Sequence, residues 1–447
     1  MEVGQLLKLK ITSLDVEGKG VSKYKDKTVF VEGALPDEEV EAVITAISRN
    51  VIFSKVTKVK NENKDRITPT CPYFEKCGGC DLMHMSYECE LKVKEEKVRT
   101  TISKIAKLNP IVNRTIAADN IKHYRNKCIV PFQEINEEVV YGFYEKRSHN
   151  VIPMQSCEIE PVVVESILQD CKEFFVDAEI SIYNEFTHQG IIRNVMIRKT
   201  YDDKLMVVII ATKKVGVLKF LAMKLMEKYN VESVYLNIND KQTNVVLADE
   251  YVLLGGNSTI TENILGLSYN VSPATFLQVN HEQCEKLYNK AIEYANLTGN
   301  ENVIDAYCGM GSITLNLAKN AKHVYGIEIV PQAIENANIN KTLNNIHNVD
   351  FICGKCEDEI VKLVNEKQID LIVFDPPRKG CDVKFLDTVI DMKIPKIVYV
   401  SCNVATLARD IKYLNENNYE VIEVTPVDLF PRTSHVETVT LLTQTKK

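Results

Sequence analysis

The C-terminal part of the chain, from about residue 285, alternates strand-like apolar runs with helix-like segments. The strand-like runs are "NVIDAY", "HVYGIEI", "VDFICG", "IDLIVFD" and "KIVYVSC". A helix after each strand requires parallel strands in one sheet with helices on both faces. Two further runs, "YEVIEVTPVDLF" and "HVETVTLLTQ", have no helix between them, which predicts an antiparallel edge strand. The pattern predicts a doubly wound, Rossmann-like α/β domain that binds ligands at the carboxyl ends of its strands.

The remaining sequence predicts two further domains, because 447 residues are too many for one compact core. Residues 1–60 alternate short β-rich runs with glycine or charged turns, which is typical of a small antiparallel OB-like barrel. Residues 61–270 hold a cysteine cluster and the helix-like "YECELKVKEEKVRTTISKIAKL". Strand-like runs such as "LMVVIIAT" and "TNVVLAD" then surround the helix-like "GVLKFLAMKLMEKYN". We expect an α+β central domain there and the α/β domain over residues 271–447.

Charge is distributed unevenly along the chain. Residues 1–130 carry 23 Lys and Arg against 18 Asp and Glu, whereas residues 131–447 carry 31 against 43. A polyanion should therefore meet the N-terminal part first, although solvated surface lysines explain the excess equally well. No run approaches the ~18 apolar residues that span a membrane, and no export signal is present. We expect a cytoplasmic protein with no membrane contact.

The first strand-to-helix junction, "DAYCGMGSITL", is a candidate nucleoside site. Gly309 and Gly311 let the backbone turn tightly and approach a ligand closely. Glu328 ends the second strand nineteen residues after Gly309, where a carboxylate can accept hydrogen bonds from ribose hydroxyls. The third glycine of a dinucleotide motif and the Lys-Ser/Thr of a phosphate loop are both missing. The junction favours S-adenosylmethionine over NAD or ATP, with a purely structural turn as the alternative.

Asp375 ends the fourth strand in "FDPPRKG", and two prolines stiffen the loop that follows. Similar loops in amino-methyltransferases hold an exocyclic amine while an aromatic residue stacks on the base. Arg378 stands at the position of that aromatic residue. Methylation of an amine is therefore disfavoured.

Cys402 ends the fifth strand in "YVSCNVATLARDI", at the predicted start of a helix. A thiol there should have a lowered pKa and act as a nucleophile. Methylation of a pyrimidine at carbon 5 needs such a group, because thiolate addition to carbon 6 makes carbon 5 electron-rich. A base must then remove the proton at carbon 5, and Glu437 in "FPRTSHVETVTLL" is the nearest candidate. An inert thiol and an edge-strand carboxylate are the alternatives, but their joint occurrence with Asp375 favours catalysis.

The segment "CPYFEKCGGC" is a candidate metal site. It holds Cys71, Cys77 and Cys80, and its two glycines allow the loop to fold around a cofactor. Thiolate ligands suit zinc or an iron–sulfur cluster, and the spacing does not choose between them. A fourth ligand must come from elsewhere: Cys89 is close in sequence, and Cys157 lies in "IPMQSCEI".

Six segments resemble, in order, the motifs of one known family. They are "ATFLQVN", "DAYCGMG", "GIEIVPQAIENA", "FDPPRKG", "VSCNVATLARD" and "FPRTSHVETV". They resemble the RNA uracil-5-methyltransferase family, the RumA/TrmA class. Upstream segments such as "HYRNKCIVPF" and "GIIRNVMIR" extend the resemblance, and residues 1–60 resemble a TRAM domain, an OB-type RNA-binding module. The resemblance covers nearly the full chain.

The resemblance implies a role for each candidate residue. It implies Cys402 as nucleophile and Glu437 as base. The implied ligands of S-adenosyl-L-methionine are Gln278, Tyr307, Glu328 and Asp375. The implied ligands of a [4Fe–4S] cluster are Cys71, Cys77, Cys80 and Cys157. Departures from the family pattern at Asp37, Leu277 and Val404 remove no group that the mechanism needs.

The resemblance also implies the substrate. Family members with both the TRAM-like barrel and the cysteine cluster usually modify large-subunit ribosomal RNA, so we expect a uridine of 23S ribosomal RNA, flipped out of its stack, and no obligatory protein partner. Transfer RNA is an alternative. An iron–sulfur RNA-binding or redox-sensing protein with a degenerate methyltransferase fold is another. A cytosine-5 methyltransferase would carry a second cysteine where this chain has Asp375. We expect the cluster to shape the central domain against RNA.

Overall fold

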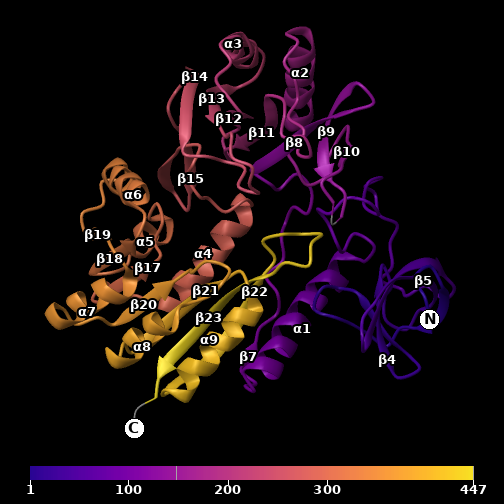
Figure 1. Ribbon diagram of the computed structural model, residues 1–447. Coiled ribbons are helices and arrows are strands. Elements are labelled where there is room, and N and C mark those ends of the chain that lie inside the picture. The colour runs from indigo at the N-terminus through magenta and orange to yellow at the C-terminus, as the bar shows by residue number, and fades with distance from the viewer. Residues whose placement is uncertain (147, 446–447) are drawn as a thin grey trace.

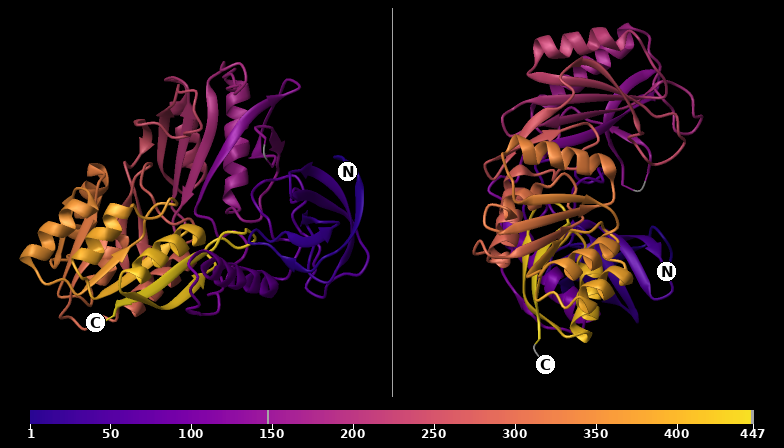
Figure 2. Two further views of the ribbon diagram at one scale, coloured as in Figure 1. Left: turned by 60° about the horizontal axis from the view of Figure 1, so that its bottom comes forward. Right: turned by 90° about the vertical axis from the view of Figure 1, so that its left-hand side faces the viewer.

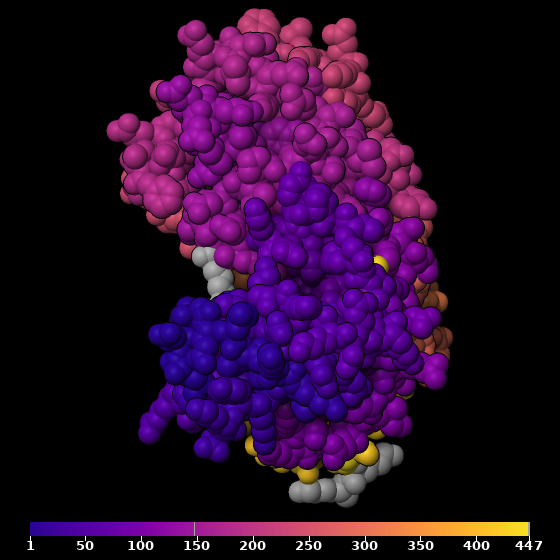
Figure 3. Space-filling view, turned by 90° about the vertical axis from the view of Figure 1, so that its right-hand side faces the viewer, coloured from indigo at the N-terminus to yellow at the C-terminus, as the bar shows by residue number. Residues whose placement is uncertain are grey.

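The computed structural model describes residues 1–146 and 148–445, which form three regions around three large β-sheets (Figure 1). The N-terminal barrel lies beside the C-terminal α/β domain, and the central sheet stands above both. Figure 3 shows the barrel and the segment that follows it covering one side of the molecule below the central domain. No helix within the described ranges is long and apolar enough to cross a membrane.

The N-terminal sheet closes on itself as a barrel. Its strands, in the order β1-β5-β6-β4-β3-β2, are β1 (Leu6–Lys10), β2 (Ser13–Leu14), β3 (Gly20–Tyr24), β4 (Lys27–Glu32), β5 (Glu39–Ile47) and β6 (Val51–Val59). The two end strands, β1 and β2, are consecutive in the chain, so the bend between them joins the edges of the sheet. There the Thr12 backbone N–H donates to the Val21 carbonyl at 2.8 Å. The β4–β6 pair is parallel, whereas an all-antiparallel barrel was expected.

A cysteine-containing segment links the barrel to a long helix, α1 (Tyr87–Ile105). The Ser86 hydroxyl accepts a hydrogen bond from the Cys89 backbone N–H at 3.2 Å and so caps the helix. Helix α1 then packs against the C-terminal domain, and β7 (Ile111–Val112) joins the edge of its sheet (Figure 2).

The central sheet has the order β10-β9-β8-β11-β12-β13-β14. Its strands are β8 (Lys127–Ile135), β9 (Glu138–Tyr144), β10 (Val151–Pro153), β11 (Ile192–Lys199), β12 (Leu205–Ala211), β13 (Val231–Ile238) and β14 (Glu250–Gly256). Two helices, α2 (Val163–Asp177) and α3 (Leu218–Lys228), cover one face. The opposite face packs into the apolar core of the C-terminal region through Met196, Met206 and Val208. Helix α3 was predicted from the sequence, and α2 was missed.

The strand expected at "TNVVLAD" is wrong, because residues 243–249 have irregular backbone and the strand β14 begins at Glu250. Side chains of the preceding strand and turn hold this segment instead of a ladder partner. The Asn239 amide donates to the carbonyls of Val245 and Val246 at 2.7 and 2.8 Å, and the Asn237 amide donates to the Ala248 carbonyl at 2.8 Å.

A β-hairpin and a helix lead into the C-terminal sheet. The hairpin is β15 (Ile260–Ile264) with β16 (Leu267–Val271), and the helix is α4 (His281–Ala295). The sheet order is β19-β18-β17-β20-β21-β23-β22-β7. The new strands are β17 (Asn302–Ala306), β18 (His323–Glu328), β19 (Val349–Cys353), β20 (Leu371–Phe374), β21 (Lys396–Ser401), β22 (Tyr419–Val427) and β23 (Glu437–Gln444).

Helices cover both faces of this sheet, as the strand–helix alternation predicts. One face packs against α4 and α5 (Ser312–Leu317), and α6 (Pro331–Leu343) lies beside β16 and β19. The other face packs against α1, α7 (Cys356–Glu366), α8 (Val383–Asp391) and α9 (Val404–Glu416).

The expectation of an antiparallel edge strand is wrong in position. The last strand, β23, is antiparallel to both of its neighbours, but it lies between β21 and β22 rather than at the edge. After β21 and α9 the chain forms β22, which is not next to β21, and then returns as β23 between these two strands. This insertion brings the start of β23 to the end of β21.

Candidate active site

Cys402 and Glu437 lie side by side at the carboxyl end of β21. Ser401 pairs with Thr438 in the antiparallel β21–β23 register, so the next residue of one strand faces the preceding residue of the other. The Thr438 hydroxyl donates to the Ser401 carbonyl at 3.1 Å. Beyond the thiol, the Asn403 side chain accepts from the Ala405 backbone N–H at 3.0 Å and caps α9. The predicted helix start at Cys402 is therefore present.

The thiol is not activated in the free protein. Burial, followed by the Glu437 and Asp375 carboxyls, raises the pKa of Cys402 to about 11, while the exposed Arg378 guanidinium lowers it. The expected lowering of the Cys402 pKa is therefore wrong. Burial and the two neighbouring carboxyls raise the pKa of this thiol by more than the start of one helix lowers it.

The two carboxyls share the same environment. Glu437 is 3% exposed, and burial together with Asp375 raises its pKa to about 8. Burial raises the pKa of Asp375 to about 7. Carboxyls with these pKa values can bind or release a proton near neutral pH, which is the property that a general base needs.

A cavity of about 850 Å³, the cofactor cavity, opens at the carboxyl ends of β17, β18 and β20. The four residues proposed to contact S-adenosylmethionine all line it: Gln278, Tyr307, Glu328 and Asp375. The Glu328 carboxylate accepts from the backbone N–H of Gly309 at 3.3 Å and from those of Ile329 and Val330 at 2.8 and 3.0 Å. These bonds fix one carboxylate at the cavity wall.

The glycine turn at this cavity is required by close packing. Gly311 has φ +82°, and a Cβ there would lie 2.5 Å from the Phe351 ring. Tyr307 also has a positive φ of 62°, a conformation that non-glycine residues seldom adopt. The backbone at the junction is therefore held in an unusual shape that brings Tyr307 to the cavity.

A second cavity of about 470 Å³, the nucleophile groove, contains Cys402. Its walls are Val16 and Glu17 of the barrel, one side of α1, the start of α9, and the loops around Arg378 and His435. Lys97 and Lys104 of α1 line it as well. Asp375 lines the cofactor cavity and also raises the pKa of Cys402, so the two cavities approach each other at this carboxyl.

The four candidate metal ligands gather in a third cavity, of about 320 Å³. Cys71, Cys77, Cys80 and Cys157 line it together, with the cations Arg125 and Lys127. Cys89 instead packs with Leu35, Leu82 and Met85 at the start of α1. Within the described residues, no group of three or more His, Cys, Asp or Glu side chains is arranged to hold a single metal ion.

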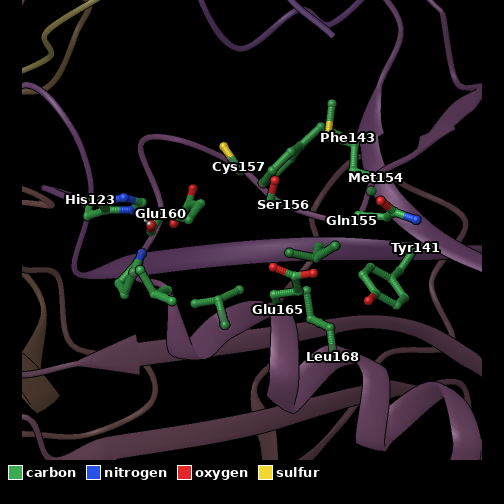
Figure 4. A pocket seen from close by; sticks show the side chains of 15 residues that line it. His123, Tyr141, Phe143, Met154, Gln155, Ser156, Cys157, Glu160, Glu165 and Leu168 are labelled. Carbon is green, nitrogen blue, oxygen red and sulfur yellow. Dashed lines mark hydrogen bonds between the residues drawn. The ribbon is translucent and has the colours of Figure 1, made fainter. Parts of the chain in front are cut away.

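A smaller apolar cavity of about 120 Å³ lies next to the cysteines (Figure 4). Glu165 and Leu168 of α2 form one wall, and Cys157 lies on the opposite side. Glu160 also lines this cavity, and burial raises the pKa of its carboxyl to about 7. The Glu160 carbonyl is 2.7 Å from Nδ1 of His123. This contact holds the turn that carries Cys157 against the segment that leads into β8.

Residues 86–445 match the family described as tRNA (uracil-5-)-methyltransferase, and residues 1–57 match the TRAM domain. The chain belongs to the tRNA (uracil-5-)-methyltransferase family. The resemblance stated from the motifs is confirmed, and so is the predicted fold of an OB-type barrel, a mixed α/β central region and a Rossmann-like methyltransferase domain. This uracil-5 methyltransferase is an RNA methyltransferase by family.

Relatives of this methyltransferase match it over nearly their whole lengths. An uncharacterized RNA methyltransferase of Listeria innocua is 42% identical over 446 residues, which cover 99% of this chain and 98% of the relative. One of Staphylococcus aureus is 40% identical over 437 residues, 96% of each chain. The crystal structure of the Pyrococcus abyssi tRNA (uracil-54, C5)-methyltransferase with S-adenosyl-L-homocysteine superposes with a TM-score of 0.77 at 24% identity, over 97% of this chain and 99% of that one. This likeness shows the shared fold.

Two residues of the methyltransferase that line the cofactor cavity were not singled out from the sequence. Phe276, 73% exposed, stands at the cavity in "ATFLQVN". Asp305 lies at the end of β17, accepts from the Thr314 hydroxyl at 2.5 Å, and burial raises its pKa to about 7. A carboxyl at the end of the first strand and an aromatic residue beside Gln278 were the signals in the sequence.

Proposed function

We propose that this methyltransferase transfers the methyl group of S-adenosyl-L-methionine to carbon 5 of a uridine in 23S ribosomal RNA. Cys402 is the nucleophile and Glu437 the base. The observation that carries the proposal is the adjacency of this thiol and this carboxyl at the point where the nucleophile groove approaches the cofactor cavity. Both groups are needed for carbon 5 chemistry, and neither would be needed to methylate an amine.

The residues of the cofactor cavity fit S-adenosylmethionine. Glu328, held by three backbone N–H groups, offers its carboxylate to ribose hydroxyls. Gln278, Tyr307 and Asp375 supply polar and aromatic contacts around it. When bound, S-adenosylmethionine supplies the electrophilic methyl group. The exposed Phe276 ring offers a surface on which a flipped base can stack.

In the proposed reaction, Cys402 adds to the base and Glu437 removes a proton from it. The Cys402 thiol loses its proton to solvent, and the thiolate, favoured by Arg378, adds to carbon 6 of the uracil. The electrons of the double bond between carbons 5 and 6 form an enolate, which makes carbon 5 nucleophilic. After carbon 5 has gained the methyl group, the Glu437 carboxylate removes its proton. The double bond between carbons 5 and 6 re-forms as the thiolate leaves. Burial of Glu437 keeps its proton affinity high enough for this step.

The four cysteines fit a [4Fe–4S] cluster. All four thiols line one cavity and could supply four thiolate ligands. The cations Arg125 and Lys127 and the carboxyls of Glu158 and Glu160 line the same cavity. The cluster, when bound, would join the loop of Cys71, Cys77 and Cys80 to the turn of Cys157.

We assign RNA contacts to residues 1–60 and 61–270, and methyl transfer to residues 271–447. The nucleophile groove supports this division, because the barrel and α1 line it together with the catalytic loops. A uridine of transfer RNA is the second candidate substrate. It is favoured by the description of the family and by the name of the Pyrococcus abyssi enzyme.

Methylation of unmodified transcripts tests the substrate. The purified protein is incubated with labelled methyl donor and either 23S ribosomal RNA or total transfer RNA, and the nucleosides are identified by mass. We expect 5-methyluridine in the ribosomal RNA. Product in transfer RNA alone would establish the second candidate, 5-methylcytidine would establish a cytosine enzyme, and binding without product would indicate an RNA-binding protein.

A further inference from the structure

The cysteine loop, defined as residues 71–82, touches the segment that leads to Glu437. This segment, the base loop, comprises residues 428–436 between β22 and β23. The backbone N–H groups of Asp81 and Leu82 both donate to the Arg432 carbonyl, at 2.9 and 3.0 Å. The Asp81 carboxylate in turn accepts from the backbone N–H and the hydroxyl of Ser434, at 3.1 and 3.0 Å. Asp81 therefore forms hydrogen bonds to the base loop at Arg432 and at Ser434, on both sides of Thr433.

The base loop needs such support because its backbone is strained. Arg432 has φ +71°, in the left-handed region that a non-glycine residue seldom adopts. Its N–H donates to the Glu90 carboxylate of α1 at 2.7 Å, and its carbonyl is the one that the cysteine loop holds. The backbone N–H and the backbone carbonyl of Arg432 thus both have hydrogen-bond partners outside the base loop.

Helix α1 fixes the other end of the base loop through a buried ion network. Lys94, 1% exposed at its side chain, donates to the carboxylates of Glu90 and Asp428 at 2.7 and 2.6 Å. The Tyr87 hydroxyl donates to the second oxygen of Asp428 at 2.7 Å. Lys97 donates to the Ser434 carbonyl at 2.7 Å. The start of the base loop is therefore anchored by α1, and its end is anchored by α1 and Asp81 together.

Glu437 follows Ser434 by three residues, and Asp81 follows Cys80 directly. The candidate cluster and the base, far apart in sequence, are thus joined by one short chain of contacts. The expected role of the cluster, to shape the central domain against RNA, does not account for these bonds.

We propose that Asp81 is a positioning residue for Glu437, and that it joins the four-cysteine site to the base loop. When the cysteines are held together, Asp81 holds Arg432 and Ser434, and the Glu437 carboxylate stays beside the Cys402 adduct. When this contact is lost, addition of the thiolate and methyl transfer proceed. Removal of the carbon 5 proton by Glu437, which releases the thiolate, becomes slow. This proposal rests on the assignment of Glu437 as the base.

The test measures the fraction of protein trapped on RNA in single turnover, with Asp81→Ala, Ser434→Ala and Asp81→Asn. Loss of two hydrogen bonds to a carboxylate should slow product release at least about tenfold in Asp81→Ala and raise the trapped fraction. Ser434→Ala should act in the same direction. Asp81→Asn keeps an acceptor oxygen and should stay within about threefold of the unmodified protein. Affinity for the cofactor should be unchanged in all three.

Glu75→Gln is the matched control, since Glu75 is an exposed acid of the same cysteine loop whose ion pair is with Lys55 of the barrel. It should change neither release nor trapping. Equal release rates in Asp81→Ala, Ser434→Ala and Glu75→Gln would overturn the proposal. If Asp81→Ala also loses iron, Ser434→Ala decides the question, because that residue lies outside the cysteine loop.

Hydrogen exchange gives a readout that does not depend on turnover. Peptides covering residues 432–437 should exchange faster in Asp81→Ala and in protein stripped of iron, without RNA or cofactor. Unchanged exchange in both would contradict the joined arrangement. The variant Glu437→Gln distinguishes an error in the assignment of the base from an error in the positioning role of Asp81. If it fails to trap the adduct, the proposed base is wrong; if it traps while both Asp81→Ala and Ser434→Ala release normally, the positioning role alone is wrong.

Discussion

Cys402 and Glu437 face each other across the β21–β23 pair, one residue beyond the Ser401–Thr438 register, and the Glu437 carboxyl raises the pKa of the Cys402 thiol. After burial, the charge of the Glu437 carboxyl contributes most to the raised pKa of the Cys402 thiol. The carboxyl that makes the thiolate harder to form in the free protein is the one that we propose as the base for the proton at carbon 5. On the proposed mechanism the two carboxyls therefore disfavour the first step, formation of the thiolate, and the Arg378 guanidinium favours it.

Replacing the nucleophile should abolish methylation without affecting the cofactor. In Cys402→Ala, the cofactor cavity is unchanged because Gln278, Tyr307 and Glu328 lie on other elements. We expect no detectable 5-methyluridine and a dissociation constant for S-adenosyl-L-homocysteine within twofold, measured by calorimetry. Cys353→Ala, at an exposed cysteine, should keep full activity. Substantial turnover in Cys402→Ala would rule out the covalent route.

Replacing the base should trap the covalent intermediate. Glu437→Gln keeps the shape of the side chain but cannot accept the carbon 5 proton, so the Cys402–RNA adduct should persist through denaturing electrophoresis. The double variant with Cys402→Ala should show no adduct, which identifies the linkage. If Glu437→Gln turns over normally, another group is the base.

Stability should fall as pH rises through the titration of Glu437. Burial raises the folded-state pKa of this carboxyl to about 8, above its unfolded value, so the folded protein binds the proton more tightly. The stabilisation is fully present below the unfolded pKa of about 4.3 and is lost by about pH 8 to 9. Glu437→Gln should therefore be more stable than the parent protein at pH 9, by an amount on the order of 2 kcal/mol. Thermal unfolding at pH 6 and pH 9 measures this, and an equal difference at both pH values would contradict it.

Iron content should distinguish the fourth cysteine ligand. Anaerobically purified protein should contain about four iron atoms, the number in this cluster type. Cys157→Ser should lose them, because Cys157 lines the cavity of the other three cysteines, whereas Cys89→Ser should retain them. Metal analysis and visible absorption measure the result. Stoichiometric zinc without iron would reject the cluster.

Lysines of the nucleophile groove should contact RNA phosphates. Lys104 lines the groove, and Lys107 is exposed on the same segment but does not line it. Lys104→Gln should weaken RNA binding and lower the slope of log affinity against log salt by roughly 0.7, the value for one phosphate contact on a single strand. Lys107→Gln should leave both unchanged. Filter binding at several salt concentrations compares them, and identical slopes would exclude Lys104 from the interface.

Local patterns in the sequence were sufficient for the α/β domain. The strands β17 to β21 lie where the apolar runs predict them, and α9 begins just after Cys402, where a helix start is predicted. The helix α2 was missed, and the strand expected at residues 243–249 lies instead at β14, because these outcomes depend on packing and on side chains such as Asn237 and Asn239. The motifs were also sufficient to find the residues around the cofactor cavity, because the carboxyl ends of parallel strands meet at one edge of a sheet.

The sequence by itself determined which residue types are available and where strands and helices form, since periodicity and turn chemistry act over a few neighbouring residues. Only the tertiary structure decided which distant residues meet. Insertion of β23 beside β21 brings Glu437 to Cys402, and folding of the cysteine loop brings Asp81 to Ser434. The tertiary structure also decided the raised pKa of Cys402, because burial and the charges of Glu437 and Asp375 depend on distances in space that no local pattern records.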